Sequence, residues 1–81
     1  MVRAEILTQA LARAPKTLCP SEVARALSSD EWRDLMPLVR QEAEVLREAG
    51  DISVTQKGEA VSATEAKGPI RLALKGSLQP Q

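Results

Sequence analysis

The chain has 81 residues, of which 43% are hydrophobic and 27% charged, and eleven basic residues balance eleven acids to a formal net charge of zero. This length allows one small domain, and the composition is ordinary for a globular protein and too apolar for a wholly disordered one. No apolar run approaches the about 20 residues that span a membrane, no secretory signal is visible, and a single cysteine excludes an internal disulfide. We therefore expect one cytoplasmic domain with no membrane partner.

The charges are unevenly distributed along the chain. Residues 1–18 carry three bases and one acid, residues 19–50 carry four arginines and seven acids, and residues 51–81 carry four bases and three acids. Phosphate contacts from lysine and arginine supply most of the non-specific affinity of a DNA-binding protein. The zero net charge therefore argues against DNA binding, while the basic surplus lies at the two ends of the chain.

The first predicted element is an amphipathic helix over residues 2–14. Its apolar residues recur at steps of three and four, which places them on one face of a helix. These residues are Val2, Ile6, Leu7, Ala10, Leu11 and Ala14. Pro15 follows and ends the helix, because proline interrupts the helical hydrogen bonds.

A second, short helix is predicted from Pro20. Proline is favoured at the first helical position, and Glu22 is placed to accept a hydrogen bond from the backbone of Cys19. The expected buried stripe consists of Val23, Ala26 and Leu27. The serines at 28 and 29 interrupt this stripe and favour a cap, so the helix has about two turns.

The third predicted helix begins near Pro37 and ends at Gly50. A proline inside a helix removes a hydrogen bond and clashes with the preceding turn. We therefore expect a short turn over residues 30–35, followed by a new helix with Pro37 near its start. Its buried face is predicted to contain Val39, Ala43, Leu46 and Ala49. Gly50 is suited to the left-handed conformation that stops a helix.

After Gly50 the hydrophobic period changes to two, which indicates strands. Ile52 and Val54 alternate with polar residues, the Lys57-Gly58 pair gives a turn signal, and residues 60–61 are suited to a return strand. The alternation at residues 70–74 predicts either a third strand or a segment that covers the sheet.

Three helices followed by a hairpin, with a brief turn between the second and third helices, is the element order of a winged helix-turn-helix. The predicted fold is therefore α+β, with a small antiparallel hairpin or three-stranded sheet after the helices. One domain is expected over residues 1–75. Residues 76–81, which are rich in glycine, proline and glutamine, are expected to form a flexible tail.

The motif string itself is similar to a known family. The runs CPSEVARAL, WRDLMPLVRQEAEVLREAGDISVTQKG and AKGPIRL resemble an uncharacterised bacterial family of short winged-helix domains of unknown function. The resemblance extends from Val2 to Leu74 and implies the winged-helix fold. It implies no activity, ligand or site residue.

The side chains that most enzymes depend on are absent. The chain has no histidine and no tyrosine, and Cys19 therefore has no histidine to activate its thiol. A zinc site needs several cysteine or histidine ligands, and the four glycines do not form a phosphate-binding loop. We expect a protein that is not an enzyme and that has neither a cofactor nor a metal.

The leading hypothesis is a DNA-binding module that uses the third helix and the hairpin. Its candidate residues are Arg40, Gln41 and Arg47 on the helix, and Lys57, Lys67 and Arg71 at the hairpin. Arginine and glutamine read base edges, while lysines at a hairpin tip contact phosphates. However, Glu42, Glu44 and Glu48 make the helix acidic, so a solvated face with internal ion pairs is the competing interpretation.

The alternative hypothesis is a protein-interaction or homodimerisation module that uses the same helix. Trp32, Glu44 and Glu48 are its candidate contact residues, because tryptophan is often an interface hot spot. A third group, Arg25, Arg33 and Arg40, has the chemistry to hold a phosphate or carboxylate. Since acids lie close by in the sequence, internal ion pairing is the favoured interpretation of these arginines.

Overall fold

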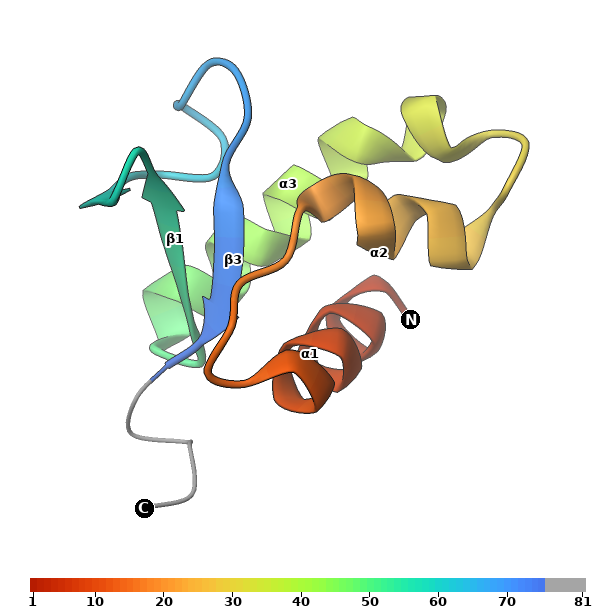
Figure 1. The fold of residues 1–81 in the computed structure, drawn as a ribbon. Coiled ribbons are helices and arrows are strands. Elements are labelled where there is room, and N and C mark those ends of the chain that lie inside the picture. The colour runs from red at the N-terminus through yellow and green to blue at the C-terminus, as the bar shows by residue number, and fades with distance from the viewer. Residues whose placement is uncertain (76–81) are drawn as a thin grey trace.

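The computed structural model describes residues 1–75 and has three helices followed by a three-stranded antiparallel sheet (Figure 1). This confirms the predicted α+β fold, and the arrangement is consistent with a winged-helix layout. The tail predicted at residues 76–81 lies outside the described residues. The elements are α1 Val2–Arg13, α2 Pro20–Leu27, α3 Trp32–Ala49, β1 Ile52–Gln56, β2 Glu59–Ala60 and β3 Arg71–Leu74.

Helix α1 buries a narrower stripe than its apolar pattern predicts. Ile6 and Ala10 are fully buried, whereas the Leu11 side chain is 59% exposed. The expectation that Leu11 lies on the buried face is therefore wrong. The helix contacts α2, α3 and β3, and these partners cover only the side that carries Ile6 and Ala10.

Helix α2 begins as its sequence indicates. The Cys19 amide donates a hydrogen bond of 2.9 Å to the Glu22 carboxylate, which satisfies a backbone group that the first turn leaves unpaired. Val23 and Ala24 are buried, but Ala26 is exposed, contrary to the prediction. The buried stripe is thus rotated toward Ala24, where α2 packs against α1 and α3.

Helix α3 begins at Trp32 and is continuous through Pro37, so the turn predicted over residues 30–35 is shorter than expected and covers residues 29–31. Pro37 lies near the helix start and removes only the bond to the carbonyl of Arg33. Both residues are exposed, so water can satisfy that carbonyl. Ala49, predicted as buried, is exposed at the other end of the helix, where Gly50 with φ of 88° provides the expected stop.

Strand β1 is the centre of the sheet, in the order β2-β1-β3. Thr55 pairs with Ala60 in β2, and Val54 pairs with Leu72 in β3, so residues 71–74 form a true third strand. Leu18 and Leu72 exchange two backbone hydrogen bonds of 2.8 Å. The segment before α2 is thereby attached to the edge of the sheet.

The core lies where the helices meet the sheet, because α1 contacts β3 and α3 contacts β1. Within residues 1–75 no polar or charged residue is buried. The core therefore carries no free-energy penalty for a buried, unpaired charge. None of the three helices is long and apolar enough to cross a membrane. The largest fully buried side chains include Ile6, Leu18, Val23, Val39, Ile52, Val54, Ile70 and Leu72.

Substitution of the fully buried Leu72 tests this core. We expect Leu72→Ala to lower the free energy of unfolding by about 2–5 kcal/mol, because it leaves a cavity between β1 and Leu18. Leu11→Ala is the control and is expected to cost less than about 0.5 kcal/mol, since Leu11 is exposed. Urea unfolding measures both, and equal losses would contradict the described core.

Candidate nucleic-acid interface

Residues 57–70 connect β1 to β3 and contain the short strand β2. We call this segment the wing. It lies at the end of the sheet remote from α1 (Figure 1). Lys57, with φ of 54°, and Gly58, with φ of 84°, form the tight turn at its start. Two buried side chains, Ala63 and Ile70, attach the wing to the core.

Arg40 of α3 holds the wing against the helix. Its Nη1 donates hydrogen bonds to the carbonyls of Ala63 at 3.3 Å and Ala66 at 2.8 Å, and its Nη2 donates to the carbonyl of Gly68 at 2.6 Å. The planar guanidinium presents several donors in a fixed fork, which suits several carbonyls at once. One side chain therefore satisfies three backbone groups of the wing.

Glu44, one helical turn after Arg40, makes a second attachment. Its carboxylate accepts hydrogen bonds from the Ala63 amide at 2.8 Å and from Arg47 at 2.8 and 2.5 Å. The Arg47 hydrogen bonds have the largest effect on the pKa of Glu44, which they lower. Burial opposes them, and the hydrogen bonds from Ala63 and Ser62 lower the pKa further, to about 2. The carboxylate is thus held ionised between its own helix and the wing.

These bonds leave α3 with few free cations. Arg40 and Arg47 were both predicted to bind nucleic acid. Arg40 instead donates hydrogen bonds to the wing, and Arg47 donates to Glu44. Gln41 is exposed, and its side-chain amide makes no hydrogen bond to another described residue. Of the three helix residues predicted to contact bases, the structure therefore presents only Gln41 with its polar groups free.

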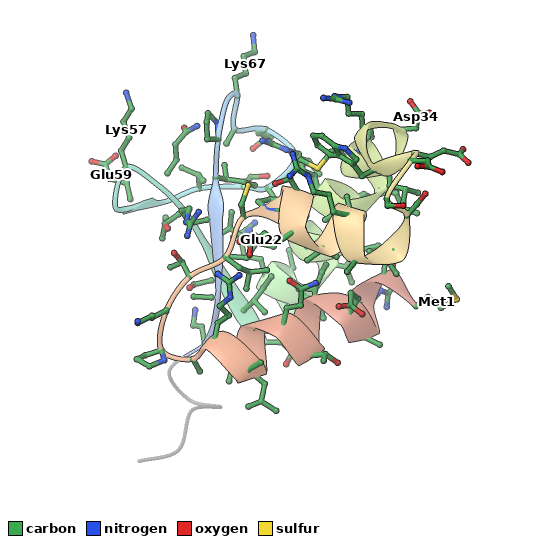
Figure 2. All side chains as sticks on the ribbon, turned by 45° about the vertical axis from the view of Figure 1, so that its right-hand side comes forward. Met1, Glu22, Asp34, Lys57, Glu59 and Lys67 are labelled. Atoms are coloured by element: carbon green, nitrogen blue, oxygen red, sulfur yellow. The ribbon has the colours of Figure 1, made fainter. Side chains whose placement is uncertain are left out.

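The three predicted hairpin residues lie together. Lys57, Lys67 and Arg71 line one surface hollow of about 730 Å³. Arg71 is held in place by a hydrogen bond of 2.9 Å from its Nε to the Thr17 hydroxyl. Lys57 and Lys67 project away from the helices (Figure 2), and their ammonium groups bond no other described residue. The remaining lining residues are Gln56, Glu59, Val61 and Pro69.

Gln56 supports this hollow and was not singled out by the sequence. Its side-chain amide donates to the carbonyls of Lys67 at 2.5 Å and Pro69 at 3.2 Å. The amide thereby links the end of β1 to the returning limb of the wing. Because its partners lie more than ten residues away, no local pattern around Gln56 indicates this role.

A second hollow of about 700 Å³ lies between α3 and the wing. Gln41 and Arg33 contribute to it from the helix, and Thr64 contributes from the wing. The two hollows therefore share the wing as a wall. The other lining residues are Met36, Pro37 and Arg40.

The residues of the alternative hypothesis do not gather on one surface. Trp32 and Glu48 lie near opposite ends of the 18-residue α3, roughly 24 Å apart at 1.5 Å per residue. Trp32 is half-buried and packs against the core, Glu48 is exposed, and Glu44 is engaged with the wing. These three side chains have no common contact site.

The internal ion pairing predicted for Arg25, Arg33 and Arg40 is wrong. The ion pairs of the described residues are Arg3 with Glu42, Arg13 with Glu22, and Arg47 with Glu44. Arg40 bonds carbonyls instead, while the guanidinium groups of Arg25 and Arg33 lie 4.2 and 4.5 Å from the ring centroid of Trp32. An aromatic face attracts a cation, and here it replaces the expected carboxylates. Residues 1–75 also contain no cluster of three acid, cysteine or histidine side chains that would bind a metal.

Loss of the Arg40 side chain tests the attachment of the wing. We expect Arg40→Gln to lower the free energy of unfolding by about 1–3 kcal/mol, because carbonyls of the wing lose their donors. Hydrogen exchange at the amides of residues 61–68 is expected to accelerate. Gln41→Ala, at the exposed neighbouring position, is the control. Wing amides that exchange equally fast in both variants would show that Arg40 does not hold the wing.

The Glu44 carboxylate gives the domain a specific dependence on acid pH. Because the folded pKa of about 2 lies below the ordinary value of 4.5, its stabilisation is complete above pH 4.5 and is lost as the pH falls toward 2. We expect Glu44→Gln to flatten the pH dependence of thermal unfolding in this range. Glu48→Gln, on the exposed side of α3, is expected to retain the wild-type slope. A Glu44→Gln variant with an unchanged slope would refute the assignment.

Comparison with known proteins identifies a family for this chain. No curated protein matches the chain. A family model with the description "Protein of unknown function (DUF3253)" matches residues 1–75, which is the whole of the helices and the sheet. The chain therefore belongs to the DUF3253 family of proteins of unknown function.

Proposed function

We propose that the domain binds double-stranded DNA through its wing and has no catalytic activity. The observation that supports this most directly is the grouping of Lys57, Lys67 and Arg71 around one hollow that contains a single acid, Glu59. Lysine and arginine at a projecting loop are suited to phosphate oxygens. The surplus of positive charge is local to the lining of this hollow, and so it is compatible with a chain of zero net charge.

The geometry favours contacts with the phosphate backbone over contacts with bases. Arg40 and Arg47 are engaged inside the domain, and Gln41 is the one free polar side chain among the predicted base-reading residues. Backbone contacts position a protein on DNA but carry no sequence information. We therefore expect binding with little sequence preference.

The composition favours duplex DNA over a single strand. Proteins that bind single strands stack successive bases on aromatic side chains. Trp32 is the only aromatic residue of the chain, and two guanidinium groups already lie against its ring. A duplex, whose bases stay stacked on one another, makes no such demand.

The proposal of a non-catalytic protein rests on the same inventory of side chains. The chain lacks histidine and tyrosine, which removes the usual acid-base groups near neutral pH. The Cys19 sulfur accepts a hydrogen bond of 3.2 Å from the Ser21 hydroxyl. That serine is no base, and so the thiol has no activating partner there.

A protein-interaction function is the second candidate, favoured by a different surface. Met1 and Leu38 are among the exposed large hydrophobic residues and line a hollow of about 420 Å³ with Val2, Leu27 and Leu35. Figure 2 places Met1 far from Lys57 and Lys67. Exposed apolar surface of this kind marks contact sites of proteins.

Charge reversal on the wing tests the proposed function. Wild-type protein is expected to bind a random duplex with an affinity that falls steeply with salt, and Lys57→Glu with Lys67→Glu is expected to abolish that binding. Each lost phosphate contact lowers the slope of log affinity against log salt by about 0.9. Fluorescence anisotropy of a labelled duplex measures both quantities.

Lys16→Glu is the matched control, because Lys16 is exposed in the loop between α1 and α2 and lines neither hollow. A lysine reversal that weakens binding equally at both places would indicate general attraction and not a wing site. Absence of wild-type binding even at low salt would reject the proposal. A mass that then rises with protein concentration would favour the protein-interaction function.

A further inference from the structure

Arg25 of α2 and Arg33 of α3 both lie against the ring of Trp32, the first residue of α3. Their guanidinium carbons lie 4.2 and 4.5 Å from the centroid of the Trp32 ring. Trp32 is itself half-buried and packs against the core. The ring therefore gives two exposed arginines from different helices a common, rigid support.

This arrangement leaves the donors of both arginines free. A guanidinium that lies over an aromatic ring uses its face, while its N–H groups point outward in the plane of the group. The guanidinium groups of Arg25 and Arg33 make no ion pair and no hydrogen bond with another described residue. Two guanidinium groups thus lie near one ring, and neither is paired with a carboxylate of the described residues.

The nearby acids do not neutralise the pair. Asp30, Glu31 and Asp34 are the carboxylates closest in sequence, yet none bonds either arginine. The backbone amide of Glu31 is bonded to the Ser28 hydroxyl at 3.1 Å, and Asp34 projects from the outer end of α3 (Figure 2). An external anion is therefore the available partner for the free N–H groups.

The arginine pair adjoins the proposed DNA surface. Arg33 lines the hollow between α3 and the wing together with Gln41 and Thr64. Thr64 and Lys67 belong to the same wing, and Lys67 lines the other hollow. A duplex that spans both hollows would contact Lys67 and Arg33.

We propose that Arg25 and Arg33, held on Trp32, form a clamp for one phosphodiester group of the duplex that the wing binds. The inference rests on the proposed function and adds a second contact to it. Arginine binds phosphate through paired N–H groups, so the clamp fixes orientation in addition to supplying charge. The wing and the clamp together would determine how the domain lies on the duplex.

Trp32 provides a direct readout, because it is the only aromatic residue of the chain. We expect its fluorescence to change saturably when an unlabelled random duplex is added, with the same midpoint as the anisotropy of a labelled duplex. Arg25→Gln with Arg33→Gln is expected to remove most of this change. It is also expected to lower the salt slope by about 0.9, the value for one phosphate contact.

Two further variants separate the clamp from general charge. Arg25→Lys with Arg33→Lys keeps both positive charges but not the paired N–H groups, and is expected to retain less than half of the fluorescence change. Lys16→Gln removes a charge that lines neither hollow and is expected to alter neither the fluorescence change nor the salt slope. Unfolding midpoints in urea identify any variant whose fold is impaired, and single substitutions then replace the double ones.

The outcomes distinguish the clamp from the proposed function. Binding that depends on Lys57 and Lys67 but is unaffected by the arginine variants, with constant Trp32 fluorescence, overturns the clamp and leaves the wing site in place. No binding of the duplex by the wild type overturns both. A phosphoserine peptide that changes Trp32 fluorescence where the duplex does not would also overturn the clamp, and would assign the pair to a protein partner.

Discussion

The hydrogen bonds from Arg40 to the wing are the interaction on which the rest of the surface depends. The wing has only the two-residue strand β2 of its own, and its backbone carbonyls need donors from elsewhere. Arg40 supplies donors to three of them, at distances between 2.6 and 3.3 Å. Glu44 adds an acceptor for the Ala63 amide. These two side chains of α3, together with Gln56 of β1, hold the wing and hence its lysines in position.

This use of Arg40 changes where the domain presents positive charge. In a helix that reads bases, a central arginine points outward to the nucleic acid. Here Arg40 bonds the wing, Glu44 bonds both the wing and Arg47, and Glu42 pairs with Arg3 of α1. Among the cations that make no ion pair within residues 1–75 are Lys57 and Lys67 on the wing, and Arg25 and Arg33 where α2 meets α3. Internal ion pairs neutralise acids as well as bases. A net charge of zero is therefore compatible with a local surplus of positive charge on the exposed surface.

The support for both proposed contact regions comes from the core. The buried side chains of Ala63 and Ile70 attach the wing to the core. The two backbone hydrogen bonds between Leu18 and Leu72 join the sheet to the segment before α2. Trp32 packs against the same core and carries Arg25 and Arg33 on its ring. Side chains held by such contacts need little ordering when they bind, which reduces the entropic cost of association. The proposed DNA contacts are in this sense prepared by the packing of the fold.

The sequence by itself determined the parts of the structure that depend on neighbours along the chain. Apolar spacing predicted the helices, Gly50 predicted the end of α3, and the change to a period of two predicted the strands, because each signal acts within a few residues. The uninterrupted course of α3 through Pro37 and the exposure of Leu11 were decided by tertiary packing. The same holds for the candidate site: Lys57, Lys67 and Arg71 were identified from the sequence, but the role of Arg40 was not. Its partners lie 23 to 28 residues away, and only the folded chain brings those carbonyls within reach of its side chain.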